Sequence, residues 1–385
     1  MATITALTAR EIQDSRGAPT IEAALSTQGG EGAASVPSGA SVGSHEARPL
    51  SAKDAVAAVG GEIAAAVLGK EFSQKSLDQT LIALDGTPGK ERLGANALLA
   101  VSIAFARAAA GEAGVPLYTY LASLGGTKPA LPCPMFNLIN GGKHAHNGLD
   151  IQEFLMVPTG IRGTAARVAA AEAVLAELKK TLETQGQNIE FGDEGGFAPQ
   201  LESNEGALDL LQSACTSAGY SPQQVRMSLD AAASSSAQKR DAAWWTELAE
   251  RYNLLSVEDP FTEDDEESFA RLQAKTPVLI VGDDLTATHA SAIARAARAG
   301  AIKAVILKPN QVGTVSETVD AAQAARAAGL TLIASHRSGE TMDTFIADFA
   351  AGLACEYIKA GAPTKPERRQ KYNRLIEIET QLSTT

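Results

Sequence analysis

Six titratable residues follow successive apolar segments in the second half of the chain. The segments are VRMSLD, LLSVED, VLIVGDD, AVILK, TLIASH and EYIK. At or next to their C-terminal ends stand, in order, Asp230, Glu258, Asp283, Lys308, His336 and Lys359. Steps of 28, 25, 25, 28 and 23 residues separate them, each the length of one strand–helix unit with its loops. A single strand commonly ends in a polar residue where it meets solvent. Six in succession predict buried parallel strands of a β/α barrel, whose catalytic groups lie at the carboxyl ends.

The three acids of this series, Asp230, Glu258 and Asp283, would converge at the mouth of such a barrel. Three neighbouring carboxylates do not all stay ionised without a cation between them, and hard oxygen ligands suit Mg²⁺. Asp259 and Asp284 are the next residues in sequence and are expected to point elsewhere, into salt bridges or loop hydrogen bonds. The pattern predicts a magnesium site.

The two lysines, Lys308 and Lys359, would face that cation site from the other strands. A neighbouring divalent ion repels the charged form of a lysine, which lowers its pKa and lets the amine act as a base. The chemistry indicated is removal of a proton alpha to a carboxylate, with metal charge stabilising the enediolate that forms.

Further polar residues stand upstream and downstream of these strands. Glu194 lies in the Gly-rich GDEGG and Glu153 in IQEF; each alone is an ordinary surface carboxylate, but facing the site either could act as a general acid. Arg337 and Ser338, beside His336, form a donor set for a phosphate or carboxylate. Residues 37–41 could form a lid whose Ser41 meets a metal or phosphate.

Composition narrows the class of protein. The chain has 385 residues and a formal net charge of −12, which argues against binding of a nucleic-acid backbone but leaves a small anionic substrate open. Three dispersed cysteines, no apolar leader and a longest apolar stretch of only residues 93–106 predict a cytoplasmic protein that binds no membrane.

Two parts of the chain are distinguishable. Residues 4–7 and 19–26 alternate like strands, and residues 51–124 are rich in Ala and Leu with helical spacing. Prolines at 129, 132 and 134 indicate a boundary, so we expect domains at 1–128 and 129–385. In the second part, helices are expected over residues 164–182, 204–218 and 314–328, between the strand-like segments.

Motifs along nearly the whole chain carry a family resemblance. They include AREIQDSRGAPTIE, VPSGAS, LGANALLAVS, FNLINGGKHA, GDEGGFAP, SVEDPF, LKPNQVGT, SHRSGETMDTFIAD and IKAGAP, in that order. The chain thus resembles enolase, the phosphopyruvate hydratase of glycolysis. The resemblance implies an α/β fold with an N-terminal α+β capping domain and an enolase-type β/α barrel whose first strands depart from strict alternation. It also implies reversible dehydration of 2-phosphoglycerate to phosphoenolpyruvate with two Mg²⁺ ions per site.

The same resemblance implies residue roles. Asp230, Glu258 and Asp283 would hold the first Mg²⁺, and Ser41 the second, shared with the substrate phosphate. Lys308 would be the base at C2, Lys359 would neutralise the substrate carboxylate, and Glu194 would be the general acid, with Glu153 hydrogen-bonded nearby. The remaining residues expected to line the substrate are His144, Gln152, His336, Arg337 and Ser338.

Some positions depart from the family pattern. The chain is shorter after HEARPL and after LDAAASSS. Val42 stands where a Thr is usual in the lid, and His146, in NGGKHAHN, stands where small or acidic residues are usual. Enolases are usually homodimers, but Glu377 stands where an arginine usually pairs with an acid such as Glu22, so a monomer is an alternative. The shortened loops leave open a homologue acting on a related phosphoglycerate-like or phosphonate substrate, and a non-enzymatic binding protein is the third alternative.

Overall fold

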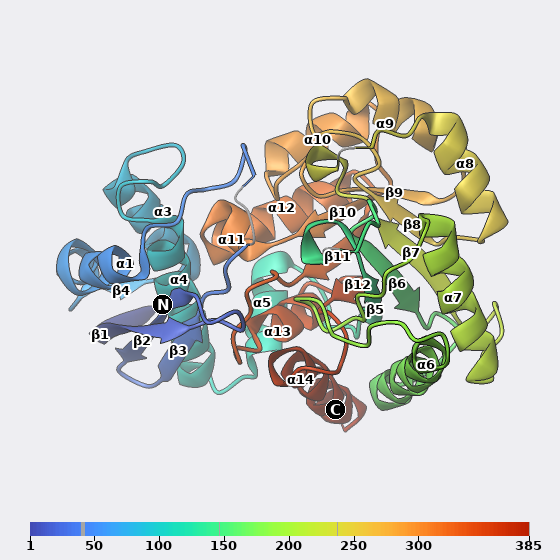
Figure 1. Ribbon diagram of the computed structural model, residues 1–385. Helices are drawn as coiled ribbons and strands as arrows, with labels where there is room; N and C mark the ends of the chain where they lie inside the picture. Colours follow the sequence, from blue (N-terminus) through green and yellow to red (C-terminus); the bar gives the residue numbers. More distant parts are fainter. Residues whose placement is uncertain (40–42, 146, 237, 385) are drawn as a thin grey trace.

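The computed structural model describes residues 1–39, 43–145, 147–236 and 238–384. Two parts lie side by side: a smaller N-terminal part, here the cap, coloured blue to cyan, and a larger barrel coloured green to red (Figure 1). The cap sheet has the order β3-β2-β1-β4 and is antiparallel. Its strands are β1 (Ala2–Gln13), β2 (Pro19–Thr27), β3 (Glu31–Ser35) and β4 (Glu71–Phe72).

Helix α4 (Ala95–Glu112) covers the cap sheet and is buried along most of its length. It packs against β2 and β3, and two glycines let the backbones approach: a Cβ at Gly30 or Gly32 would lie 2.1 Å from a carbonyl oxygen of α4. The other cap helices are α1 (Ala52–Ala58), the π-helix η1 (Val59–Ile63), α2 (Ala64–Val67), α3 (Gln74–Asp85) and α5 (Leu117–Gly125). The two expected strands are thus confirmed, and the helices expected from the spacing over residues 51–124 are present.

Eight strands close the barrel in the order β10-β11-β12-β5-β6-β7-β8-β9. Their bounds are β5 (Cys133–Asn140), β6 (Glu153–Val157), β7 (Arg226–Asp230), β8 (Ser256–Glu258), β9 (Leu279–Gly282), β10 (Ala304–Leu307), β11 (Thr331–Ser335) and β12 (Tyr357–Lys359). The six predicted strands β7 to β12 pair in parallel, as expected for βα units. β6 runs antiparallel to both β5 and β7, which is the expected departure from strict alternation.

Helices surround the barrel (Figure 1). The three expected ones are present as α6 (Thr164–Thr184), α7 (Asn204–Ser217) and α12 (Val315–Ala327). The other helical segments are η2 (Gly142–His144), η3 (Ala233–Ser235), α8 (Ala242–Arg251), α9 (Glu266–Gln273), α10 (Ala290–Arg298), α11 (Pro309–Val312), α13 (Phe345–Gly352) and α14 (Pro366–Ser383).

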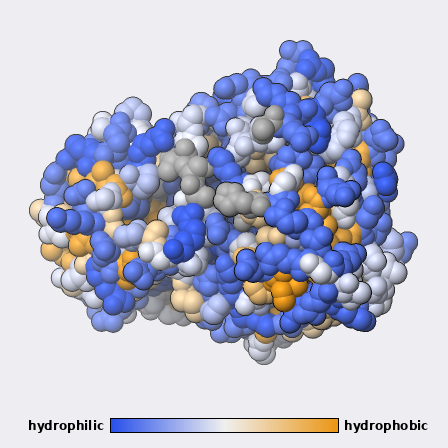
Figure 2. All heavy atoms as spheres, viewed as in Figure 1, coloured by the Kyte–Doolittle hydropathy of each residue, from blue (hydrophilic) through white to orange (hydrophobic). Residues whose placement is uncertain are grey.

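The face seen in Figure 2 is mostly hydrophilic, with separate small apolar patches. All three cysteines are free and buried, as predicted from their sequence context. In the described part of the chain, no single helix has the length and apolar character to cross a membrane; one pair, α4 with α5, meets those criteria together but is bent by 105°.

The cap contacts the barrel where the predicted site lies. The N–H of Ser38 donates to the carbonyl of Gly339 (2.7 Å), and the N–H of Ala47 donates to that of Gln311 (2.8 Å). Arg107 of α4 forms a bidentate pair with Asp343 (2.6 and 2.7 Å). These contacts hold the segments on either side of residues 40–42 against the carboxyl ends of β10 and β11.

Candidate active site

A cavity at the carboxyl ends of the barrel strands gathers ionisable side chains from both parts of the chain. Its lining has seven carboxyl groups but only four cationic side chains. The acids are Glu46, Glu153, Glu194, Asp230, Asp259, Asp283 and Asp284; the cations are Lys143, Lys308, Arg337 and Lys359. Glu258, which is not part of the lining, lies directly behind it on Lys359. Because acids outnumber cations in this lining, a bound cation would reduce the repulsion among them.

Lys359, at the end of β12, is held by three carboxylates. Its Nζ lies 2.8 Å from Glu258, 3.2 Å from Asp230 and 3.2 Å from Glu153, and its side chain is 2% exposed. Burial alone would lower the pKa of this lysine, but the surrounding acids raise it well above its usual range. Burial, and next the repulsion of Asp230, raise the pKa of Glu258. Lys359 is therefore a fixed cation within a crowded carboxylate cluster.

Lys308 follows β10 and contacts one carboxylate closely, that of Asp283. Burial would lower the pKa of Lys308 and raise that of Asp283, but the attraction within the pair reverses both shifts. Asp283 also accepts from the amide of Gln311 (3.0 Å), while the N–H of Lys308 donates to Thr288 (2.9 Å). Thr288 in turn donates to Gln311 (2.5 Å), so Thr288 and Gln311 fix the pair. Sequence reasoning missed both, although Gln311 lies within the quoted LKPNQVGT.

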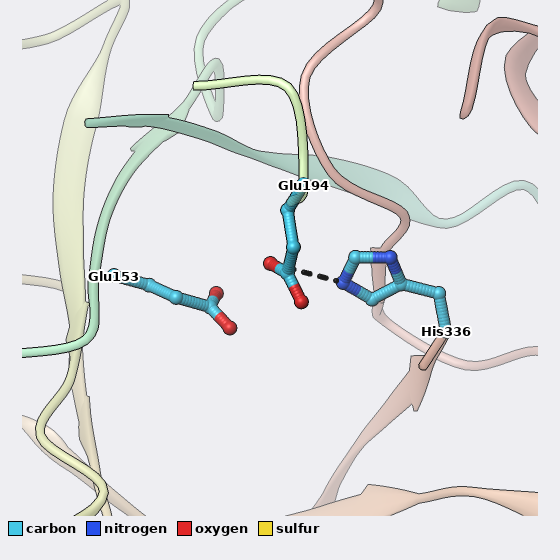
Figure 3. A group of neighbouring side chains, drawn as sticks. All are labelled: Glu153, Glu194 and His336. Atoms are coloured by element: carbon cyan, nitrogen blue, oxygen red, sulfur yellow. Dashed lines mark ion pairs between the residues drawn. The ribbon is translucent and has the colours of Figure 1, made fainter. Parts of the chain in front are cut away.

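Glu153, Glu194 and His336 form a second group, drawn in Figure 3. The His336 Nε2 lies 3.4 Å from Glu194, which also accepts from the amide of Asn137 (3.0 Å). On the other ring nitrogen, Nδ1 meets the guanidinium of Arg368, which can only donate. Nδ1 is therefore the acceptor, and Nε2 carries the hydrogen and donates it in a hydrogen bond to Glu194. Burial lowers the pKa of His336 to about 4, so the ring is neutral at pH 7.

Glu153 points toward Glu194 in the same group (Figure 3). Burial, and next the neighbouring Glu194, raise the pKa of Glu153 well above its usual range. Such a shift favours the protonated form of a buried carboxyl, which can pass a proton to its neighbour. The pair is thus suited to deliver a proton.

Asp259 and Asp284 line the same cavity, so the expectation that they point elsewhere is wrong. Asp259 has a left-handed backbone (φ 41°), which turns the chain after β8. Its carboxylate accepts from the N–H groups of Asp283 (3.0 Å) and Asp284 (2.7 Å), the loop hydrogen bonds expected of it. Burial, and next Asp283, raise the pKa of Asp284 to about 7. Carboxylate oxygens of these three aspartates lie within 4.8 Å of one another.

Arg337 is buried at the cap side of the cavity and is held by an acid that sequence reasoning missed. Glu46 accepts from both of its terminal nitrogens, at 2.7 and 3.3 Å, and Asn310 accepts at 3.2 Å. Glu46 stands directly after His45 in the chain, and nothing in its local sequence distinguishes it from other surface acids.

Comparisons with known proteins agree with this geometry. The model described as "Enolase, N-terminal domain" matches residues 4–121, and that described as "Enolase, C-terminal TIM barrel domain" matches residues 128–244 and 236–385. A protein named "Enolase" from Methanocaldococcus jannaschii is 45% identical over 405 aligned residues, which cover 98% of this chain and 95% of that protein. This chain belongs to the enolase family.

The alignment with that enolase is longer than this chain's 385 residues, so the relative carries segments that are absent here. This agrees with the two shortened stretches seen in the sequence.

Other residues expected from the enolase resemblance have different outcomes. Gln152 lines the cavity, and its N–H donates to the carbonyl of Asp230 (2.9 Å). Ser338 also lines it and accepts from Arg16 (3.4 Å), while the backbone of His144 closes η2. Ser41, with Val42 and His146, lies outside the described residues.

The donor set fits a hard divalent cation. The cavity offers carboxylate oxygens from several strand ends, without a thiolate among its described lining residues. Burial, and next the repulsion of neighbouring acids, raise the pKa values of Glu258, Asp259 and Asp284. A bound Mg²⁺ would relieve that repulsion.

Proposed function

We propose that this chain catalyses the reversible, Mg²⁺-dependent dehydration of 2-phosphoglycerate to phosphoenolpyruvate. The observation that carries the proposal is the cavity at the strand ends, which combines a carboxylate cluster, two buried lysines and a buried arginine. Such a set is suited to a small substrate with a carboxylate and a phosphate, which the family membership independently indicates.

Lys308 is proposed as the base that takes the proton from C2 of the substrate. Its support is its contact with a single close carboxylate, Asp283, and a side chain that is 16% exposed to the cavity. A cation bound by Asp283 would take the place of the lysine ammonium and lower the pKa of Lys308 toward the working range of a base.

Lys359 is proposed to neutralise the substrate carboxylate. Because it is surrounded by carboxylates and fully buried, it keeps its proton throughout the reaction and acts as a fixed positive charge. A charge fixed before the reaction stabilises the developing anion without a reorganisation cost.

Glu194 is proposed as the general acid that gives its proton to the departing C3 hydroxyl, which leaves as water. The support is the neighbouring carboxyl of Glu153, whose raised pKa favours its protonated form, together with the contact to the neutral His336. The proton taken at C2 and the hydroxide lost at C3 then account for the conversion to the enol phosphate and water.

The substrate phosphate is proposed to pair with Arg337 and Ser338, with His336, Gln152 and His144 lining the site. Arg337 suits this role because a guanidinium binds a phosphate through two parallel hydrogen bonds. We further propose that Asp230, Glu258 and Asp283 hold one Mg²⁺ and that Ser41 contributes to a second. When bound, Mg²⁺ supplies positive charge that stabilises the anion formed at the substrate carboxylate.

The assembly and cellular place of the protein also remain proposals. A boundary near residue 128 is supported by the family ranges, which leave residues 122–127 between them. Glu22 and Glu377 each have an arginine in their own chain, Arg10 (2.7 Å) and Arg374 (2.9 Å). These partners weaken the repulsion expected between the two acids, so we propose the homodimer usual for enolases, in the cytoplasm.

The test is a spectroscopic assay with purified protein, 2-phosphoglycerate and Mg²⁺. Absorbance of the enol product is expected to rise, and to stop rising when a chelator removes Mg²⁺. Correctly folded protein that gives no rise would contradict the proposal. A panel of phosphoglycerate-like and phosphonate substrates, run beside it, tests the alternative that the shortened loops serve a related compound.

A further inference from the structure

A second cavity, of about 470 Å³, lies between α8 and α9 outside the active site. Its walls are the loop from β7 to α8 and the loop from β8 to α9, together with residues of the two helices. Four cationic side chains line it, Lys239, Arg240, Arg271 and Lys275, against two acidic ones, Asp241 and Asp265. Its volume is in the range of sites for small molecules. Residue 237 lies outside the described residues.

The two acids of this cavity are already engaged by the backbone. Asp241 is the N-cap of α8 and accepts from the N–H of Trp244 (2.9 Å), and Asp265 is the N-cap of α9 and accepts from the N–H of Ser268 (3.1 Å). Neither forms an ion pair with a lining cation among the described residues. These N–H donors are uncharged, so both acids keep their charge, and the lining carries two more cationic than acidic side chains.

The cations differ in how they are held. Arg271 pairs with Glu267 (2.6 Å), and Arg240 pairs with Asp150 (3.3 Å) and lies over the ring of Trp244 at 4.7 Å. The Nε of Arg240 is buried without an acceptor among the described residues. Lys239 and Lys275 have no carboxylate partner in that part of the chain. The cavity therefore offers two lysines to a negatively charged group.

The remaining lining is apolar. Pro260 and Phe261 follow β8, and Ala242 and Ala243 begin α8. Phe261 is itself packed edge-on against Phe269, with ring centroids 5.7 Å apart, so this wall is firm. An apolar wall beside a cationic rim matches a ligand with a hydrophobic body and an acidic group.

We propose that the second cavity binds a small organic anion, with its apolar body on Pro260 and Phe261 and its charged group between Lys239 and Lys275.

One wall separates this anion from the active site. Ala233 lines the second cavity, whereas Ala232 and Ser235 line the catalytic one. The N–H of Ala232 donates to Asp230 (3.0 Å), and that of Ala233 donates to the carbonyl of Asp259 (3.1 Å). An occupant that packs against this wall changes how the loop holds Asp230, so it alters the rate of dehydration. This consequence rests on the proposed function; the binding itself does not.

The protein carries its own reporter of binding. Its two tryptophans, Trp244 and Trp245, are neighbours in α8 beside the cavity, and the indole N–H of Trp245 donates to the carbonyl of Pro260 (3.2 Å). The probe is anilinonaphthalene sulfonate, an aromatic anion that accepts excitation energy from tryptophan. Titration of the full chain is expected to give saturable energy transfer with one site, weakened by added salt.

Charge reversal tests the location. Lys275→Glu and Lys239→Glu are each expected to weaken probe binding by about tenfold or more, since a favourable contact becomes repulsive. Lys75→Glu makes the same charge change at an exposed lysine of α3 in the cap and is expected to leave binding unchanged. Lys308→Ala, in the catalytic cavity, is also expected to leave it unchanged.

Absence of saturable transfer, or equal affinity in Lys275→Glu, would overturn the proposal, as would loss of binding in Lys308→Ala. The dehydration rate measured with and without probe tests the link through the wall: a change is expected in the parent protein and not in Lys275→Glu. Equal rates in the parent protein would refute the link. Because fluorescence needs no turnover, a protein inactive on 2-phosphoglycerate still gives a clear result for binding.

Discussion

Lys308 and Lys359 both stand at the ends of barrel strands, but their surroundings differ. Three carboxylates contact Lys359, whereas Asp283 alone holds Lys308 closely. The Lys359 side chain is 2% exposed and that of Lys308 16%. The lysine with many partners is a permanent cation, and we propose that the one with a single exchangeable partner loses and regains a proton during the reaction. The number of carboxylates around each amine thus separates structural charge from acid–base work.

The largest expected effect is on turnover when the exchangeable lysine is removed. Lys308→Ala is expected to reduce kcat by about 10³-fold or more, because proton abstraction loses its base. Steady-state kinetics check this, and calorimetry is expected to show Mg²⁺ binding retained. Lys303→Ala, at an exposed lysine just before β10, is the matched control and is expected to keep full activity.

Next comes the stability of the cluster around Lys359. Lys359→Met leaves Glu153, Asp230 and Glu258 buried without their shared cation, so the free energy of unfolding is expected to fall by about 3–5 kcal/mol. Urea denaturation without Mg²⁺ measures it. Lys308→Met unpairs only Asp283, which keeps the amide of Gln311, and is expected to lose less. Equal losses in the two variants would remove the contrast between the lysines.

A smaller effect is expected where the cavity meets the substrate phosphate. Arg337→Lys keeps the charge but loses the planar pair of donors, so KM for 2-phosphoglycerate is expected to rise about 10–100-fold, with a smaller change in kcat. Kinetics at several substrate concentrations separate the two constants. If only kcat fell, Arg337 would act on the chemical step rather than on phosphate binding.

The smallest effect concerns the neutral His336, in contrast to the two charged lysines. Burial lowers the pKa of His336 to about 4, against an ordinary value of about 6.5, so the unfolded chain takes up a proton first as the pH falls. The contribution of His336 to the free energy of unfolding is therefore complete above pH 6.5. It falls between pH 6.5 and pH 4, by up to about 1.4 kcal/mol per pH unit.

Urea titrations across that pH range are expected to show the decline in the parent protein and a shallower one in His336→Asn. The same slope in both proteins would mean that His336 does not take part in the pH dependence.

Much of the fold and site could be predicted from the sequence. Asp230, Glu258 and Lys359 end their strands and Asp283, Lys308 and His336 come directly after theirs, because the regular βα repeat leaves a visible spacing. The same reasoning placed α6, α7 and α12 to within two residues at each end. A structural unit that repeats along the chain, such as the βα unit, is therefore visible as a pattern in the sequence.

Contacts between distant segments could not be predicted in this way. Asp259 returns to the cavity because of its left-handed backbone, and Glu46 reaches Arg337 across 291 positions of sequence. The tautomer of His336 depends on Arg368 of α14, and Lys308 depends on Thr288 and Gln311. Nothing local in the sequence marks these partners, since tertiary packing alone brings them together.

The central claim is that Lys308, and not Lys359, removes the C2 proton of 2-phosphoglycerate. The most direct measurement is exchange of the C2 hydrogen with solvent deuterium, followed by NMR in the presence of Mg²⁺. The parent protein is expected to exchange this hydrogen and form phosphoenolpyruvate, and Lys308→Ala is expected to do neither while still folded and binding Mg²⁺. Exchange at the parent rate in Lys308→Ala would contradict the account.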